Sequence, residues 1–260
     1  METKELAIIV LSCDKFSSLW PLFFKRLDQH FPVSSSKIYL LTNYLNYTAQ
    51  GKHAVEGVCV GGDVSWSDNL VKLLSGIKES NVLLLIEDGP FSARVDIGKV
   101  EFFYQLFLDR NMNYLNLKAT PMPDENVGEF VGEISRSKGY RTALVPSMWR
   151  KEVLVSLLEV GESAWEFEVF GSERSKDYGG FFAVKKPIFS FDHIIVKGKI
   201  DRRAYRRLKK NNEHLNIDFP LMTHFELAKE MLAELRTFLL TILLPEFLLQ
   251  YLRKLRYQQQ

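Results

Sequence analysis

The sequence predicts an α/β protein whose mostly parallel sheet is covered by helices on both faces. Runs of aliphatic residues without polar alternation, such as "VLLLI" at 82–86, are typical of strands buried on both sides. Such runs alternate with amphipathic segments; in one of them Leu70, Leu73, Leu74 and Ile77 recur at helical spacing. A content of 46% hydrophobic and 25% charged residues supplies enough apolar material for a sizeable core.

The first half of the chain carries the regular part of this pattern. The expected strands follow one another along the chain at residues 6–11, 37–42, 55–61, 81–88 and 114–118. The expected helices lie between them, at residues 17–31, 65–80 and 96–112. Residues 119–139 are rich in Pro, Gly and polar residues, so we expect a long loop there.

The second half is less regular. A helix is expected at 151–160, short strands at 181–186 and 193–199, a basic helix at 202–210 and a long helix from 221 onward. The interval between 161 and 180 is left without an assignment.

Charge and cysteine content exclude several classes of protein. A formal net charge of +2 over 260 residues is too small for a protein dominated by attraction to nucleic acid. Cys13 and Cys59 fit no zinc spacing and make no disulfide framework, which favours a reducing, cytoplasmic compartment. We expect no signal peptide, and the apolar stretch 237–252 is interrupted by Pro245 and Glu246, so it falls short of the ~20 residues of a membrane span.

Polar residues follow three of the expected strands. They are Ser12-Cys13-Asp14, Asp63 and the adjacent carboxylates Glu87 and Asp88. Ligands of open α/β sheets bind outside the carboxyl ends of the strands, so we expect these groups to converge on one crevice. The helix start near Ser67 and Asn69 could add an anion site, or be an ordinary capped helix; the other groups could equally be strand-ending turns.

Six motifs carry a resemblance to a known family. They occur in the order "SCDK", "GGDVSWSDNL", "LLLIEDGPF", "PSMWRKEVL", "SAWEFEVFGSERS" and "VKGKI". With them the chain resembles bacterial GT-A glycosyltransferases of polysaccharide and capsule assembly, over roughly residues 6–200. The resemblance implies a GT-A, Rossmann-like nucleotide-diphospho-sugar transferase domain at 1–200, followed by basic and amphipathic C-terminal helices at 201–260.

The resemblance also implies where the sugar donor binds. GT-A enzymes carry an Asp-x-Asp pair at the end of a central strand, and Glu87-Asp88-Gly89 stands at that place with glycine at the usual third position. A magnesium or manganese ion held by Asp88 and His193 is one expectation and a metal-independent site the other, with a structural role for His193 as the alternative. The expected donor- and nucleotide-binding residues are Ser12, Cys13, Asp14, Asp63, Ser67, Asn69, Glu87 and Asp88.

A downstream carboxylate is implied as the general base of an inverting reaction, taking the proton of the acceptor hydroxyl. The "WEFE" segment offers Glu168, with Glu166 as the second choice. The two point the same way in an extended segment and differently in a helix. Trp165 and Phe167 would form apolar walls that raise carboxylate basicity, although an ordinary amphipathic strand would look the same.

The C-terminal region combines cations with an apolar stripe. "RRAYRRLKK" at 202–210 is followed by apolar residues at 225, 228, 232, 235, 239 and 242, and by Arg253, Lys254 and Arg256. A helix of this kind fits the surface of an anionic inner leaflet, or a homodimer interface.

Together these observations predict a glycosyltransferase, peripheral on the inner face of the cell membrane. It would move a sugar from a nucleotide-sugar donor to a glycan or a polyprenyl-diphosphate-linked acceptor. Two alternatives stay open: another nucleotide-sugar or nucleotidyl-transfer enzyme, and a degenerate GT-A domain that serves as a membrane-bound assembly partner. The lack of glycine in "SCDKFSSLW" counts against nucleotidyl transfer.

Overall fold

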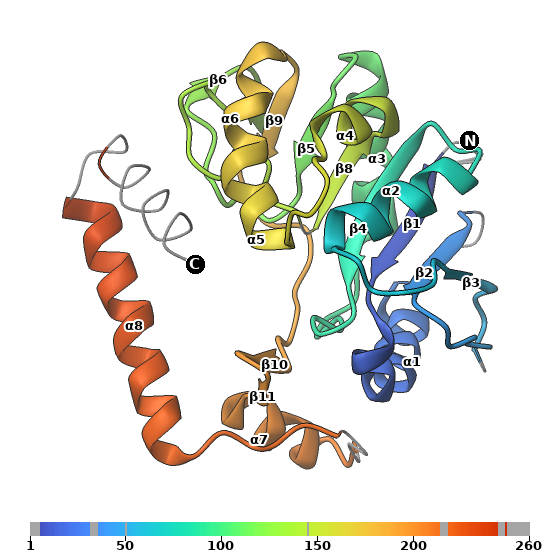
Figure 1. The fold of residues 1–260 in the computed structure, drawn as a ribbon. Helices are drawn as coiled ribbons and strands as arrows, with labels where there is room; N and C mark the ends of the chain where they lie inside the picture. Colours follow the sequence, from blue (N-terminus) through green and yellow to red (C-terminus); the bar gives the residue numbers. More distant parts are fainter. Residues whose placement is uncertain are drawn as a thin grey trace.

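The computed structural model describes residues 6–31, 36–49, 51–144, 146–213, 218–243 and 248. In these residues a nine-stranded sheet has the order β3-β2-β1-β4-β8-β5-β9-β7-β6 (Figure 1). Its strands are β1 (Leu6–Leu11), β2 (Ile38–Thr42), β3 (Val55–Cys59), β4 (Asn81–Ile86), β5 (Tyr114–Asn116), β6 (Glu125–Asn126), β7 (Val131–Glu133), β8 (Ser147–Arg150) and β9 (Phe181–Val184). The expected α/β class with a mostly parallel sheet is confirmed.

The strand order reverses at β1. The chain passes from β1 to β2 and β3 on one side, and then returns to place β4 on the other side of β1, all in parallel. β8 runs antiparallel between β4 and β5, while β5 and β9 are again parallel to each other. The gap between β1 and β4 is therefore a topological switch point, where ligands of such sheets bind.

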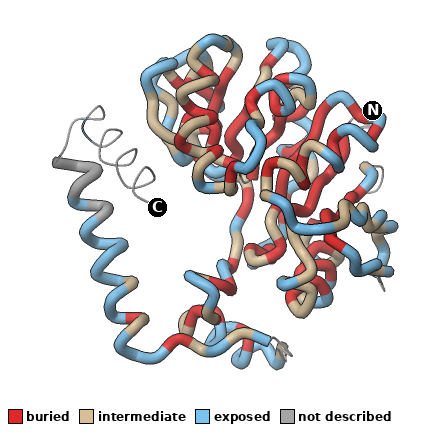
Figure 2. Tube along the Cα trace, in the orientation of Figure 1, coloured by how far each residue is buried: buried red, intermediate tan, exposed pale blue. Residues whose placement is uncertain are grey.

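Helices cover both faces of the sheet, and therefore every residue of β1, and all but the last of β4, is buried. Side chains alternate across a strand, so Ile8 packs with Phe23 of α1 (Trp20–His30) and Phe103 of α3 (Ile97–Asp109). Its neighbour Ile9 packs on the opposite face, with helices α2 (Trp66–Gly76) and α4 (Lys151–Leu157). The buried residues concentrate in these layers (Figure 2).

Two parts of the second half differ from expectation. The expected loop at 119–139 contains β6 and β7, which pair with each other and extend the sheet beyond β9. The "WEFE" segment is helical: α5 (Ala164–Glu166) continues into a π-helical turn, η2 (Phe167–Gly171), then α6 (Ser172–Arg174) and the 3-10 turn η3 (Ser175–Asp177). The interpretation of "WEFE" as an amphipathic strand is therefore wrong, because Ser163 caps a helix at this point with its own side chain.

The C-terminal part consists of the hairpin β10 (Ile195–Val196) and β11 (Lys199–Ile200), α7 (Arg202–Lys210) and α8 (His224–Leu243). Ile194, Ile200 and Leu208 pack with Leu19 of the 3-10 helix η1 (Asp14–Leu19). Helix α8 then rises along one side of the molecule, separated from the sheet layers in this view (Figure 1). The sequence after it, including the expected cations 253–256, lies outside the described residues apart from Leu248.

Candidate functional site

The switch point brings the polar ends of β1 and β4 together. Leu11 and Ile86 are partners in the parallel register of the two strands. Ser12 and Glu87, the next residues on each strand, therefore leave the sheet side by side. We call the side of the sheet where β1, β4 and β5 end the carboxyl edge.

Glu87 is the buried member of the carboxylate pair. Its residue is 4% exposed, and its Oε2 makes no hydrogen bond within the described part of the chain. Burial, with the charge of Asp88 as a second cause, raises the pKa of Glu87 well above its ordinary value, while the Ser12 side chain opposes this. The two adjacent acids are thus not equivalent: Glu87 favours the neutral form.

Asp88 is the member that carries charge near neutral pH. Burial raises its pKa to about 6, and the positive charge of Lys118 acts in the opposite direction. Lys118 is an exposed residue two positions beyond the end of β5. Its charge also acts on Glu168, where it opposes the effect of burial on the pKa, and on His193, where it adds to that effect.

A second chain segment seats His193 next to the pair. Residues 190–194 run antiparallel to 88–92, with backbone bonds from Ile194 to Asp88 (2.7 Å) and from Asp192 to Pro90 (3.0 Å). A Cβ atom on Gly89 would lie 3.7 Å from the His193 ring. Burial is the first cause of a lowered pKa of His193, which favours the neutral imidazole.

Glu168 lies on the π-helical turn η2. Its Oε1 accepts a hydrogen bond from the backbone amide of Leu144 at 2.9 Å, in the segment that enters β8. Burial raises the pKa of Glu168, opposed by this bond and by Lys118. Glu168 is thus partly exposed, held in one orientation and raised in pKa, and these properties suit a general base.

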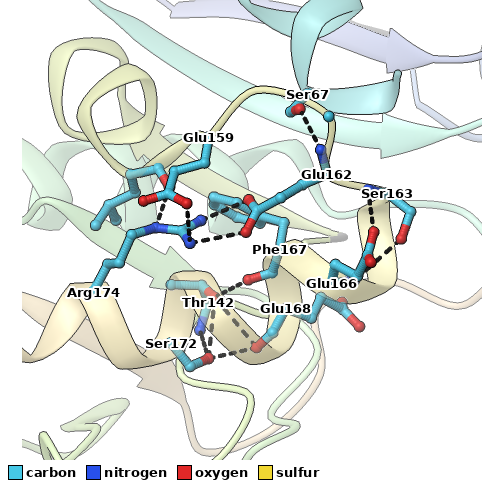
Figure 3. Close-up of polar contacts among 12 residues, drawn as sticks. Ser67, Thr142, Glu159, Glu162, Ser163, Glu166, Phe167, Glu168, Ser172 and Arg174 are labelled. Carbon is cyan, nitrogen blue, oxygen red and sulfur yellow. Dashed lines mark hydrogen bonds and ion pairs between the residues drawn. The ribbon is translucent and has the colours of Figure 1, made fainter. Parts of the chain in front are cut away.

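The π-helical turn is held by neighbouring hydroxyl groups. The Thr142 hydroxyl donates to the carbonyl of Phe167 (3.2 Å), and the Ser172 hydroxyl donates to the carbonyl of Glu168 (2.6 Å), as Figure 3 shows. The Thr142 amide in turn donates to the Ser172 hydroxyl at 3.1 Å. Single π-helical turns cost regular helix bonds and are frequent at functional sites.

Glu166 has a structural role at the start of the helix. Its carboxylate accepts from the backbone amide of Ser163 at 2.7 Å and completes a capping box at the start of α5 (Figure 3). The helix therefore separates Glu166 from Glu168, as expected for a helical segment. Of the two expected apolar walls, Phe167 is buried in the core, whereas Trp165 is 67% exposed. Trp165 does not enclose Glu168.

Asp14 organises the loop after β2. Its carboxylate accepts from the amides of Asn43 (2.9 Å) and Tyr44 (2.9 Å), and the side chain of Asn43 accepts from the amide of Asp14. Asp14 thus builds the rim of the carboxyl edge, and its contact with a nucleotide base stays a prediction. Cys13 is half-buried, and burial raises the pKa of its thiol, with Glu87 and Asp63 as further causes, so the thiol is neutral.

The start of α2 does not fit the expected anion site. The amide of Ser67 donates to the Glu162 carbonyl (3.1 Å), and the amide of Asp68 donates to the Ser65 hydroxyl (3.1 Å). The Ser67 hydroxyl also accepts from the amide of Glu162 (Figure 3). These bonds occupy donors that an anion would need and give buried Ser67 a structural role.

Asp63 and Asn69 lie beside this helix start. The side-chain amide nitrogen of Asn69 donates to the Asp63 carboxylate at 2.6 Å. Asn69 Oδ1 is buried without a partner among the described residues. Asp63 itself is exposed and close enough to Cys13 to influence its pKa. Asp63 therefore remains a donor-binding candidate at the carboxyl edge, with Asn69 supporting it.

The residues at this edge fit a divalent ion only in part. No group of three or more His, Cys, Asp or Glu residues is arranged for a metal in the described part of the chain. Asp88 and His193 are two candidate ligands, so a magnesium or manganese ion would need phosphate oxygens and water to complete its shell. Glu87 adds a buried carboxyl oxygen that has no partner among the described residues, and burial raises the pKa of this group.

Comparison with known proteins adds similarities of low identity. No protein-family model matches the chain, and no curated protein does so significantly. A solved structure of S. aureus TarS (1–349) is similar at 13% identity and a TM-score of 0.48, covering 73% of this chain and 59% of that one. The same protein in complex with UDP is similar at 10% identity and 0.46, covering 82% and 65%. The chain thus spans less than two thirds of these TarS structures.

Two other similar structures are covered almost completely by this chain. HddC from Yersinia pseudotuberculosis is similar at 10% identity and a TM-score of 0.49, covering 80% of this chain and 99% of that one. A CMP:2-keto-3-deoxy-manno-octonic acid synthetase complexed with CTP is similar at 13% and 0.45, covering 80% and 99%. All four TM-scores lie below 0.5, so the fold rests on the chain's own topology and the site on its own residues.

Proposed function

We propose that the chain is a glycosyltransferase that moves a sugar from a nucleotide-sugar donor to a glycan or a lipid-linked glycan. The observation that supports this most is the carboxyl edge: Asp88 follows β4 at the switch point, His193 lies beside Gly89, and the charge of Lys118 acts on Asp88, His193 and Glu168. These groups come from four separate parts of the chain. A charged acid, an ammonium group and a second acid of raised pKa are what binding a diphosphate and activating a hydroxyl require.

In this proposal the donor lies outside the ends of β1 and β4. Asp88 holds the donor sugar, or a divalent ion on the diphosphate, and the Lys118 ammonium group faces the diphosphate. As the bond from the anomeric carbon to the diphosphate breaks, negative charge grows on the leaving oxygen. A positioned cation stabilises that charge without needing to rearrange.

Glu168 acts on the acceptor. The acceptor oxygen attacks the anomeric carbon, its proton passes to the Glu168 carboxylate, and the nucleoside diphosphate leaves with the electron pair of the broken bond. The product would have the inverted configuration. The bond from the Leu144 amide keeps the carboxylate in one orientation during this transfer.

The nature of the acceptor rests on the sequence resemblance. A glycan carried on polyprenyl diphosphate would place the enzyme at the inner face of the cell membrane. No helix among the described residues has the length and hydropathy to cross a bilayer.

Calorimetric titration with UDP, GDP, CDP and TDP, followed by product analysis with the matching nucleotide-sugars, tests the proposal. We expect one nucleoside diphosphate to bind, and its sugar conjugate to yield a glycoside and free nucleoside diphosphate. Pyrophosphate release from a nucleoside triphosphate and a sugar phosphate would instead establish nucleotidyl transfer. Donor binding without any turnover across a glycan panel would favour the assembly-partner alternative.

A further inference from the structure

Helix α8 is attached to the rest of the molecule by a row of ion pairs. Glu226, Glu230 and Glu234 follow one another at intervals of four residues, so they lie along one side of the helix. Glu226 pairs with Lys199, Glu230 with Lys197 at 2.5 Å, and Glu234 with Arg203 at 2.8 Å. We call these three pairs the α8 clamp.

The partners of the clamp are themselves anchored. Arg203 also binds Asp201, the residue that caps α7 through the amides of Arg203 and Ala204. Arg207 of α7 pairs with Asp192 at 2.8 Å, and Asp192 binds the buried Arg26 of α1 at the same distance. The clamp therefore fixes which side of α8 faces the hairpin and α7.

The opposite side of α8 is largely apolar and exposed, and the Lys229 ammonium group lies 4.7 Å from the centroid of the Phe225 ring. Phe225, Leu232, Leu235 and Leu239 are 68%, 65%, 53% and 46% exposed. At 3.6 residues per turn these positions are centred nearly opposite the three glutamates. Figure 2 shows exposed residues along the described length of the helix. We call these four residues the α8 stripe.

Unpaired cations lie on the neighbouring helix. Arg206, Lys209 and Lys210 of α7 are exposed and form no ion pair with the residues that the structure describes. The acids of α8 are meanwhile taken up by the clamp. On α8 itself, Lys229 and Arg236 are exposed and flank the α8 stripe at helical spacing, so the partner of this side should be apolar and anionic at once.

We propose that α8 lies in the plane of an anionic membrane surface, with the α8 stripe in the headgroup–acyl boundary and the flanking cations Lys229 and Arg236 at the lipid phosphates. An in-plane helix combines an apolar side, a charged side and a length that does not need to span the bilayer. A second copy of this chain would bring the same cations and no anionic charge of its own to this surface. The proposal stands independently of glycosyl transfer.

Flotation of the full chain with vesicles tests the proposal. We expect it to float with vesicles of phosphatidylglycerol and phosphatidylcholine, and at least tenfold less with phosphatidylcholine alone. Replacing Leu232 and Leu235 by Glu should lower binding at least tenfold. Replacing Val155 and Val160 by Glu makes the same charge change at two other exposed sites and should leave most of the binding in place. Each of Lys229→Gln and Arg236→Gln should lower binding roughly fivefold.

Two further measurements decide the outcome. Hydrogen exchange of the unaltered protein should slow in 225–239 when anionic vesicles are added. Absence of flotation by the unaltered chain overturns the proposal. Light scattering that shows a dimer which Leu232→Glu with Leu235→Glu dissociates, without vesicle binding, assigns the stripe to a second copy and also overturns it.

Discussion

Acidic side chains have opposite environments at the carboxyl edge and in the C-terminal helices. At the edge, Glu87 has a buried oxygen without a partner among the described residues, and burial raises the pKa of Asp88 to about 6. In α8, Glu226, Glu230 and Glu234 each pair with a cation. Burial raises the pKa values in the first region, whereas ion pairing lowers that of Glu226 to about 2 in the second.

The difference separates acids that orient the chain from acids that are held ready for a ligand. A paired carboxylate fixes a helix and needs nothing else. A carboxyl that is buried without a partner costs free energy, because water has been removed and nothing replaces it. Proteins keep such groups mainly where they act, so the comparison points to the carboxyl edge as the working site.

Glu168→Gln is expected to have the largest effect on turnover. The change keeps volume and the bond from the Leu144 amide but removes the proton acceptor, so kcat should fall by about 10²–10⁴-fold with donor affinity nearly unchanged. Glu166→Gln is the matched control, because it can still complete the capping box at Ser163. Full turnover in a folded Glu168→Gln protein would remove Glu168 from the mechanism. If Glu166→Gln alone abolishes turnover, the base moves by two residues.

Lys118→Met should weaken donor binding roughly tenfold, about 1.4 kcal/mol, because it removes a cation whose charge acts on both Asp88 and Glu168. Lys186→Met, at another exposed lysine, is the control. Removal of divalent ions with EDTA should weaken binding less than Lys118→Met does, since no group of three ligands is arranged among the described residues. Loss of binding in EDTA with unchanged affinity in Lys118→Met would assign the diphosphate to a metal ion instead.

Glu230→Gln should have the smallest effect. It removes one pair of the α8 clamp, which involves the largely exposed Lys197, so the free energy of unfolding should fall by less than about 1 kcal/mol. Hydrogen exchange in α8 should quicken, and the effect should fade at high salt. Donor affinity should not change. Coupled losses in α8 and at the carboxyl edge would show that the two regions are not independent.

The sequence was sufficient for the layers of the fold and for the strands that carry the site. Continuous aliphatic runs identified β1, β2 and β4, and the strand-end rule placed Ser12 and Glu87 at one edge. It was insufficient where an outcome depends on neighbours distant in sequence. The bonds between the 160–163 segment and the start of α2, which occupy donors of the expected anion site at Ser67, are of this kind.

Two features of the site were not predicted from the sequence, because they too depend on neighbours distant along the chain. The π-helical turn of Glu168 depends on hydroxyl groups of Thr142 and Ser172, which no local pattern connects. Lys118 follows β5, so the strand-end rule identifies it once β5 is known to lie next to β8 and near β4. That neighbourhood is visible only in the observed strand order.

Asp88→Asn joins both sides of the comparison. The pKa of Asp88 is raised from 3.8 to about 6 in the folded protein, so the folded state binds this proton more tightly than the unfolded state. Its contribution to stability is present below about pH 4 and is lost as the pH rises through about 6. Above pH 7 the charged group destabilises the fold, on the order of 1–3 kcal/mol, and asparagine removes that charge.

The most direct measurement is therefore denaturant unfolding of the wild-type protein and Asp88→Asn at pH 7.5, each with and without the nucleotide-sugar that binds. Ligand that binds only the folded state adds to the free energy of unfolding. We predict that Asp88→Asn is the more stable protein without donor and gains less from saturating donor, with affinity lowered at least tenfold. A variant that is less stable without donor, and gains as much from it as the wild type, would contradict the assignment of the carboxyl edge as the donor site.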